Sequence, residues 1–230
     1  MKQKHILPPD QTPINLVLVT LDTHLGGVLK RTEKSLRRHL PNLKLKAHAA
    51  ANWNASPQAL EECKEDIASG DIIVVTMLFM EDHINAVLPA LTARKEICDA
   101  MICCMSASEV MQLTRMGRFR MDAEQTGAMG LLKRLRGKSQ SSKKGAGAQQ
   151  LSILKKLPSI LRFIPGTAQD VRAYFLTLQY WLAGSEDNLK ELFLFLVDRY
   201  AEDEREPLKG LFKAKPPVEY PEVGVYHPSI

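Results

Sequence analysis

The sequence contains no long hydrophobic run and no secretory signal. None of its apolar stretches reaches the ~18 consecutive residues that a membrane-spanning helix requires. The N-terminus, MKQKHILPPDQTP, lacks the apolar centre and the small-residue cleavage site of a signal peptide. These two absences predict a cytoplasmic protein with no transmembrane segment.

Cysteine is scarce, and its four positions fit neither a disulfide framework nor a zinc site. Cys103 and Cys104 are adjacent within an apolar run, whereas structural zinc sites use separated pairs of ligands. Cys63 and Cys98 stand alone in the sequence. We therefore expect four reduced thiols in the hydrophobic core, where burial makes a thiol unreactive.

Motifs of nucleotide binding and of serine hydrolysis are also missing. The glycine pair in THLGGVL belongs to neither G-x-G-x-x-G nor G-x-x-x-x-G-K-[ST]. Ser106 and Ser108 follow an apolar run but lack the G-x-S-x-G elbow of the α/β hydrolases. The sequence thus predicts neither a bound nucleotide nor a hydrolase triad.

Acidic residues are absent between Gly127 and Gln169, a stretch that holds nine basic ones. Subtracting these nine charges from the net charge of +5 leaves −4 on the rest of the chain. Such a segment suits an anionic surface or an acidic partner, and equally a solvated linker. No aromatic residue is interleaved among the lysines and arginines of residues 133–156 to stack on bases, so we expect no nucleic-acid partner.

Four apolar runs rich in branched residues alternate with segments of helical periodicity. The predicted strands are residues 14–20, 43–49, 71–79 and 100–106, and the predicted helices are residues 25–40, 56–69, 81–97 and 106–117. The first and third strands are apolar nearly throughout, as parallel strands covered on both faces are. This order, with right-handed crossovers, predicts an α/β fold with a doubly wound, mainly parallel sheet of the Rossmann or flavodoxin kind.

The borders of the second predicted helix are marked by the residues that helices prefer at their ends. Ser56 is placed as the N-cap, Pro57 occupies the first helical position and Gly70 stands where the helix should stop. Pro89 is expected to kink the third helix or to lie near its first turns.

The composition changes after Met121. Residues 123–150 are rich in Gly, Ser, Lys and Gln, which cannot bury enough apolar surface to offset their ordering entropy, so they predict a flexible basic linker. From residue 151 helical periodicity returns, and Gly184 ends the second of these helices.

We therefore divide the chain into four parts. An N-terminal tail over residues 1–13 precedes a head domain over residues 14–122, and the linker separates this head from residues 151–230, the helical start of a next domain. The extended ending, KPPVEYPEVGVYHPSI, has no terminating element, which suggests that the sequence is part of a larger protein.

Polar side chains follow two of the predicted strands. Asp22, Thr23 and His24 come after the first strand, and Glu81, Asp82 and His83 come after the third. If the strand order is 2-1-3-4, these ends are neighbours at the carboxyl edge, where open α/β sheets bind ligands. The two carboxylate–imidazole pairs could then surround a divalent cation or a polar ligand. The alternative is structural, because these residues also suit helix caps and the positive end of a helix dipole.

Several longer blocks of the sequence resemble a known family. They are VTLDTHLGGVL, HAAANWNASPQALEEC, DIIVVTMLFMEDHINAVLPAL, CDAMICCMSASEVMQLTRMGRF and LRFIPGTAQDVRAYFLTLQYWLAGSEDNL. Together they look like the N-terminal part of the large, porphyrin-binding H subunit of magnesium chelatase, over residues 14–228. The block RFIPGTAQDVRAYF and the basic linker are most similar to the form from bacteriochlorophyll-making bacteria, and the cobalt chelatase large subunit is a more distant relative.

The resemblance implies an enzyme that inserts Mg²⁺ into protoporphyrin IX, driven by ATP hydrolysis, in bacteriochlorophyll or chlorophyll biosynthesis. The implied partners are two smaller motor subunits, which bind the ATP, and the methyltransferase that acts next on Mg-protoporphyrin. Because members of the family are several times longer, we expect no catalytic residue and no tightly bound cofactor in this chain. It should be an assembly or regulatory head, inactive alone, in the cytoplasm or peripheral to the photosynthetic membrane.

Two alternatives remain open beside this interpretation. Arg162, Arg172, Tyr180 and Trp181 are candidates for porphyrin contact, since arginine pairs with carboxylates and an aromatic stripe could line a planar cavity. The same residues equally suit a core helix with surface arginines. The chain could also be a stand-alone α/β module that binds a small ligand or a metal as a sensor or carrier.

Overall fold

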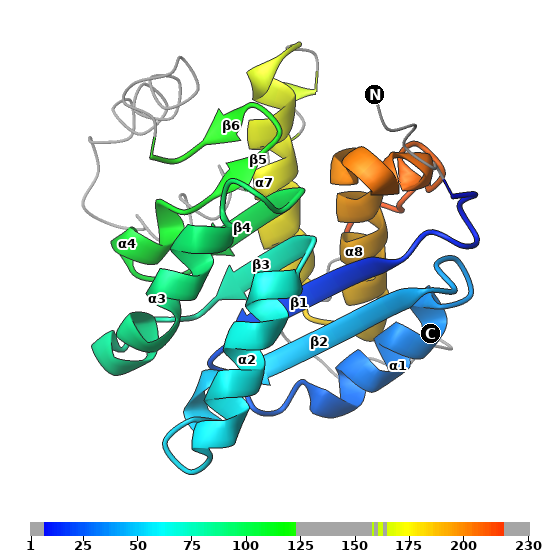
Figure 1. Ribbon diagram of the computed structural model, residues 1–230. Coiled ribbons are helices and arrows are strands. Elements are labelled where there is room, and N and C mark those ends of the chain that lie inside the picture. Colours follow the sequence, from blue (N-terminus) through cyan, green and yellow to red (C-terminus); the bar gives the residue numbers. More distant parts are fainter. Residues whose placement is uncertain (1–6, 123–157, 159–160, 163–164, 219–230) are drawn as a thin grey trace, which may run out of the picture.

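A six-stranded, mostly parallel sheet forms the centre of the computed structural model, which describes residues 7–122, 158, 161–162 and 165–218 (Figure 1). The strands are β1 (Ile14–Thr20), β2 (Leu43–Ala49), β3 (Ile72–Thr76), β4 (Ala100–Cys104), β5 (Arg115–Met116) and β6 (Phe119–Arg120). Their order is β2-β1-β3-β4-β5-β6, with the first four parallel and the last two antiparallel. The predicted α/β class and the predicted 2-1-3-4 order are both confirmed.

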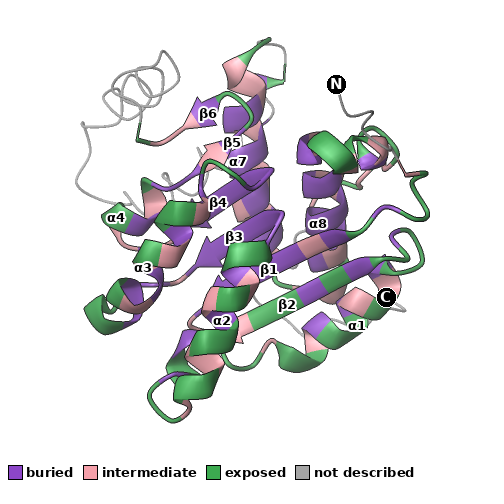
Figure 2. Cartoon of the chain, in the orientation of Figure 1, coloured by how far each residue is buried: buried purple, intermediate pink, exposed green. Residues whose placement is uncertain are grey.

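Burial follows the position of each strand in the sheet. All residues of β3 and β4 are buried, and so are all but one of β1 (Figure 2). β2 alternates between buried Leu43 and Leu45 and exposed Lys44 and Lys46, as an edge strand with one solvated face does. The apolar runs of the sequence therefore mark the strands that helices cover on both sides.

Helices cover both faces of the sheet. α1 (Gly26–Leu36), α7 (Thr167–Ala183) and α8 (Glu186–Tyr200) pack on one face, and α2 (Pro57–Ser69) and α3 (Glu81–Arg94) pack on the other (Figure 1). The side chains of β1 alternate accordingly, because Leu16 and Leu18 join the first core whereas Val17 and Val19 join the second. The shorter helices include η1 (Ala50–Asn52), α4 (Ser108–Met111) and η2 (Asp203–Leu208).

The predicted end signals of α2 and α7 are confirmed. The Ser56 hydroxyl accepts a hydrogen bond from the Ala59 N–H at 3.3 Å, and Pro57 occupies the first turn of α2. Gly184 ends α7 in the left-handed conformation, with φ of 58°. Pro89 lies inside α3 on an exposed position.

Several predicted elements end earlier than expected. The helices predicted over residues 25–40 and 81–97 end at Leu36 and Arg94, and the strand predicted over residues 100–106 ends at Cys104. The strand predicted over residues 71–79 ends at Thr76, because Met77 takes a positive φ of 62°. The helix predicted over residues 106–117 is limited to α4, after which β5 pairs antiparallel with β4. The Thr114 hydroxyl exchanges hydrogen bonds with both the N–H and the carbonyl oxygen of Cys103, which holds this segment against the sheet.

Helices α7 and α8 share the hydrophobic core of the sheet. The sequence assigns them to the start of a next domain, but buried Tyr174 of α7 and Phe193 of α8 belong to the same apolar cluster as Leu16 and Leu18. α8 lies beside α1 (Figure 1). Within the described ranges we therefore find no separate core for these helices.

None of the described helices is long and apolar enough to cross a membrane.

Candidate functional site

The carboxyl ends of β1 and β3 are neighbours, as the sequence predicts, and α1 and α3 leave them toward opposite faces of the sheet. The residues after β1 form a local turn. Asp22 accepts a hydrogen bond from the His24 N–H through Oδ1 at 2.7 Å, and its own N–H donates to the Thr20 hydroxyl at 3.3 Å. Thr23 and His24 are exposed. Asp22 thus stabilises the turn that leads into α1.

The residues after β3 open α3. Glu81 and Asp82 are exposed in its first turn, where carboxylates interact favourably with the helix dipole. His83 is buried instead, and its ring meets the Trp53 ring edge-on, with centroids 5.7 Å apart at 83°. Nδ1 of His83 is buried without a hydrogen-bond partner among the described residues.

These five candidate side chains do not converge. Successive residues of a helix point about 100° apart, so the exposed carboxylates of α3 and its buried imidazole face different surroundings. Across the described ranges, no group of three or more His, Cys, Asp or Glu side chains is arranged to hold a metal ion.

The four porphyrin-contact candidates have structural contacts or lie on the surface. Tyr180 and Trp181 belong to the core beneath α7 and α8. Burial raises the pKa of Tyr180 to about 12, with a further contribution from Glu191, and the Tyr180 hydroxyl donates to the carbonyl oxygen of Lys215. Arg172 donates to the Pro158 carbonyl oxygen at 2.9 Å, and Arg162 is exposed.

All four cysteines are free and buried, as the sequence predicts. Burial raises the pKa of Cys63 to about 12 and that of Cys104 to about 12. Burial also raises the pKa of Cys103, whose side chain lies in the core on the opposite face of the sheet from Cys104. None of these thiols is poised to act as a nucleophile.

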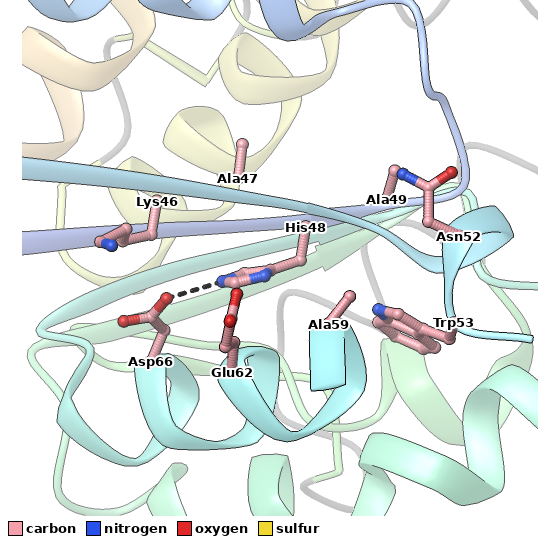
Figure 3. A pocket seen from close by; sticks show the side chains of 9 residues that line it. All are labelled: Lys46, Ala47, His48, Ala49, Asn52, Trp53, Ala59, Glu62 and Asp66. Carbon is pink, nitrogen blue, oxygen red and sulfur yellow. Dashed lines mark hydrogen bonds and ion pairs between the residues drawn. The ribbon is translucent and has the colours of Figure 1, made fainter. Parts of the chain in front are cut away.

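A polar pocket of about 260 Å³ lies between β2 and α2, and the sequence did not predict it (Figure 3). His48 projects from the end of β2 toward α2, where its Nε2 lies 2.9 Å from Oδ2 of Asp66. Glu62, one turn earlier on α2, presents its carboxylate to the same imidazole, and Trp53 closes the opposite end (Figure 3). The remaining lining residues are Lys46, Ala47, Ala49, Asn52 and Ala59.

The surroundings of the His48 imidazole shift its pKa in opposite directions. Burial lowers the pKa of His48, while the negative charge of Asp66 and its hydrogen bond raise it, and the burial effect is the larger. A carboxylate on Nε2 leaves Nδ1 as the atom available to a ligand. The lining combines an imidazole, two carboxylates, an amide and an ammonium group, and such a set of polar groups suits the binding of a small polar ligand.

A larger, more open cavity of about 750 Å³ surrounds Asp170. The Asp170 carboxylate accepts hydrogen bonds from Arg199 at 3.0 Å, from the Tyr200 hydroxyl at 3.1 Å and from the N–H of Arg118 at 3.0 Å. It thereby joins the start of α7 to the end of α8 and to the β5–β6 turn. The contacts of Asp170 therefore stabilise the fold.

Comparison with known proteins gives evidence of the family of this chain, which the geometry of the two pockets does not give. Residues 15–175 match the family model described as domain of unknown function DUF3479. The chain is 43% identical over 223 residues to the magnesium-chelatase H subunit of Cereibacter sphaeroides, covering 96% of this chain and 18% of that protein. It is 41% identical over 225 residues to the corresponding protein of Rhodobacter capsulatus, covering 97% of this chain and 19% of that protein.

A plant relative is more distant. The chloroplastic magnesium-chelatase protein ChlH of Oryza sativa subsp. indica is 30% identical over 165 residues, which is 71% of this chain and 12% of that protein. The chain thus spans about a fifth of the length of the bacterial relatives. The resemblance found in the sequence is confirmed: the chain belongs to the DUF3479 family and corresponds over almost its whole length to one region of the magnesium-chelatase H subunit.

Proposed function

We propose that this chain acts as the N-terminal head region of a magnesium-chelatase H subunit. The complete enzyme inserts Mg²⁺ into protoporphyrin IX for bacteriochlorophyll biosynthesis, and the two smaller partner subunits bind and hydrolyse ATP. The observation that carries this proposal is the 43% identity to the Cereibacter sphaeroides protein across 96% of the chain.

The head, in this proposal, serves assembly or regulation and does not perform the insertion. Insertion requires removal of two pyrrole protons and partial dehydration of Mg²⁺, which calls for a base and oxygen ligands around the macrocycle. Two of the candidates for these roles are engaged in the fold, since Asp22 stabilises a turn and His83 packs against Trp53. The other three, His24, Glu81 and Asp82, are exposed on the surface. These contacts support a structural role for the carboxyl edge of the sheet.

A chimera tests the proposal. The matched region of the Cereibacter sphaeroides protein is replaced by this chain, and Mg-porphyrin formation is followed by fluorescence with the partner subunits, ATP and Mg²⁺. We expect the chimera to be active, a variant lacking the region to be impaired, and the isolated 230-residue chain to be inactive. An inactive, folded chimera, or insertion by the isolated chain, would contradict the proposal.

A second function is favoured by one observation, the His48 pocket. A stand-alone α/β module could bind a small polar ligand between His48, Glu62 and Asp66 as a sensor or carrier. Calorimetric titration of the chain with divalent cations and with protoporphyrin distinguishes the two functions. Binding that is lost in His48→Ala but kept in His24→Ala would support the sensor, and the absence of binding would leave the head region as the better interpretation.

A further inference from the structure

Two neighbouring apolar side chains are exposed at the carboxyl edge of the sheet. Phe79 and Met80 link β3 to α3, and 58% and 56% of their surfaces are exposed. They are the only adjacent pair among the large apolar residues that are exposed in the described ranges, the others being Ile97, Leu182, Leu211 and Val218. Phenylalanine and methionine are among the residues that are enriched at the centres of protein interfaces.

The segment that carries this pair is held firmly by the neighbouring loop after β4. The Met77 N–H donates to the Met105 carbonyl oxygen at 3.0 Å, and the Ala107 N–H donates to the Leu78 carbonyl oxygen at 2.8 Å. The Leu78 N–H donates to the Ser106 hydroxyl at 3.1 Å. Leu78 is fully buried, whereas the next two side chains are exposed.

The backbone beneath the pair is strained on both loops. Met77 has φ of 62° and Met105 has φ of 47°, in the left-handed region that residues other than glycine rarely adopt. Each such residue costs about 1–2 kcal/mol. Strain of this kind persists where the surrounding contacts fix it, and it is concentrated at binding sites. The two methionines therefore indicate that the geometry of this edge is maintained for contact.

The surroundings of the pair carry charge of one sign. Residues 17–29, 72–93 and 100–114, which form this edge and the helices that leave it, contain no lysine or arginine. Glu81 and Asp82 are exposed directly after Met80, and Glu109 lies two residues after Ala107. Within the part of the chain that the structure describes, none of these three carboxylates has an ion-pair partner. α3 and α4 lie on the same side of the molecule (Figure 1).

We propose that Phe79 and Met80 form the centre of a docking surface for another part of the magnesium-chelatase H subunit, one that presents an apolar groove bordered by lysine or arginine. This inference rests on the proposed function. The choice of partner follows from the comparisons, because the chain covers 18% of the Cereibacter sphaeroides protein and most of that protein lies outside the match. The acidic border supplies the charge complementarity that selects a basic groove.

Hydroxyl-radical footprinting tests the contact, because it reports solvent access at single side chains. The 230-residue chain is compared with the full-length chimera in the absence of partner subunits. In the chimera we expect oxidation of Phe79 and Met80 to slow by roughly fivefold or more, since the centre of an interface is almost fully buried. Ile97, which is 66% exposed in the turn after the C-terminal end of α3, should oxidise equally in both proteins.

A charge-reversed chimera separates the docking contact from general shielding. Glu81→Lys together with Asp82→Lys should restore rapid oxidation of Met80, whereas Glu61→Lys together with Glu65→Lys on the exposed side of α2 should not. Equal oxidation of Met80 in the free chain and in the original chimera would overturn the inference. Protection that instead grows with the concentration of the free chain would assign the surface to a second copy, and would also overturn it.

The two proposals fail in distinguishable ways. An active chimera with an unprotected Met80 leaves the head-region function intact and removes only the docking surface. A folded but inactive chimera contradicts the head-region function whether or not Met80 is protected.

Discussion

The guanidinium of Arg205 donates two hydrogen bonds to the carboxylate of Asp99, from Nε to Oδ2 at 2.7 Å and from Nη2 to Oδ1 at 2.6 Å. The two residues are 106 positions apart in the sequence. Asp99 precedes β4 and Arg205 lies in η2, so this pair fixes the segment after α8 to the amino edge of the sheet. The Glu202 N–H donates a third hydrogen bond to Asp99 at 3.0 Å.

Replacing Arg205 by Ala should therefore destabilise the fold strongly. Asp99 is 2% exposed and would remain buried without its cation, which typically costs about 3–5 kcal/mol. Urea denaturation measures the loss in the free energy of unfolding. Arg37→Ala, which removes an exposed i,i+4 pair with Glu33, is the control and should cost less than about 1 kcal/mol. Equal losses in the two variants would contradict the role given to Asp99.

The sheet and the helices α7 and α8 should unfold together. Trp53 reports on the face covered by α2 and α3, and Trp181 reports on the face covered by α7 and α8. Because one sheet lies between the two cores, both faces should unfold in a single transition. In each single-tryptophan variant, Trp181→Phe and Trp53→Phe, the midpoint of the fluorescence transition in urea should coincide with the midpoint measured by far-UV circular dichroism. A fluorescence transition that is displaced from the circular dichroism in either variant would indicate two independent domains.

Gly117→Ala should be more harmful than Gly184→Ala. Both glycines have positive φ, of 55° and 58°, so an alanine costs about 1–2 kcal/mol at either position. At Gly117 an added Cβ would also lie 2.9 Å from Oδ2 of Asp170, whereas at Gly184 its nearest neighbour is 3.7 Å away. Free energies of unfolding from urea denaturation give the difference. If the two variants lost the same stability, the packing of Asp170 against the β5–β6 turn would be refuted.

The folded protein should lose stability in mild acid because His48 takes up a proton more readily in the unfolded chain. Burial lowers the pKa of this imidazole in the folded state below its ordinary value of 6.5, so the unfolded chain binds the proton more readily. The stabilisation is therefore complete above pH 6.5 and is lost as the pH falls from 6.5 through the lower folded-state pKa. The His48 pKa is measured by NMR titration of the imidazole, and urea denaturation at several pH values follows the stability.

Two variants control the assignment to His48. His48→Gln cannot take up the proton and should have a flatter pH profile of stability between about pH 7 and pH 5. Asp66→Asn removes the charge that raises the imidazole pKa, so that pKa should fall further. A rise of the His48 pKa in Asp66→Asn would mean that the 2.9 Å contact does not exist in solution.

The cysteines should resist labelling in the folded protein. With pKa values raised to about 12, Cys63 and Cys104 remain protonated at about pH 8 and are shielded from reagent. Titration with Ellman's reagent should detect almost no thiol before denaturant is added and all four afterwards. Rapid modification of one thiol in the native protein would show that its strand opens locally.

The sequence by itself determined the elements whose signals are local. The apolar runs of β1 and β3, the Ser56–Pro57 start of α2 and the Gly184 stop of α7 all depend on contacts within a few residues. A chain in which such strands and helices alternate has few possible topologies, so the order and parallel direction of the first four strands could also be predicted from the sequence. The family could be recognised because long blocks of the sequence are distinctive.

The tertiary structure decided the features that require residues distant in the chain to meet. The local sequence around Thr114 and Met116 is compatible with a helix. The segment forms strand β5 only because it pairs with β4. His48 and Asp66 belong to different elements with no shared motif, so the pocket became visible only when α2 was placed over β2. His83 and Phe79 illustrate the same limit, because the sequence places both at the end of β3 without showing which is buried and which is exposed. Local propensity depends on neighbours a few residues away, whereas burial depends on surfaces contributed by elements as far apart as Asp99 and Arg205.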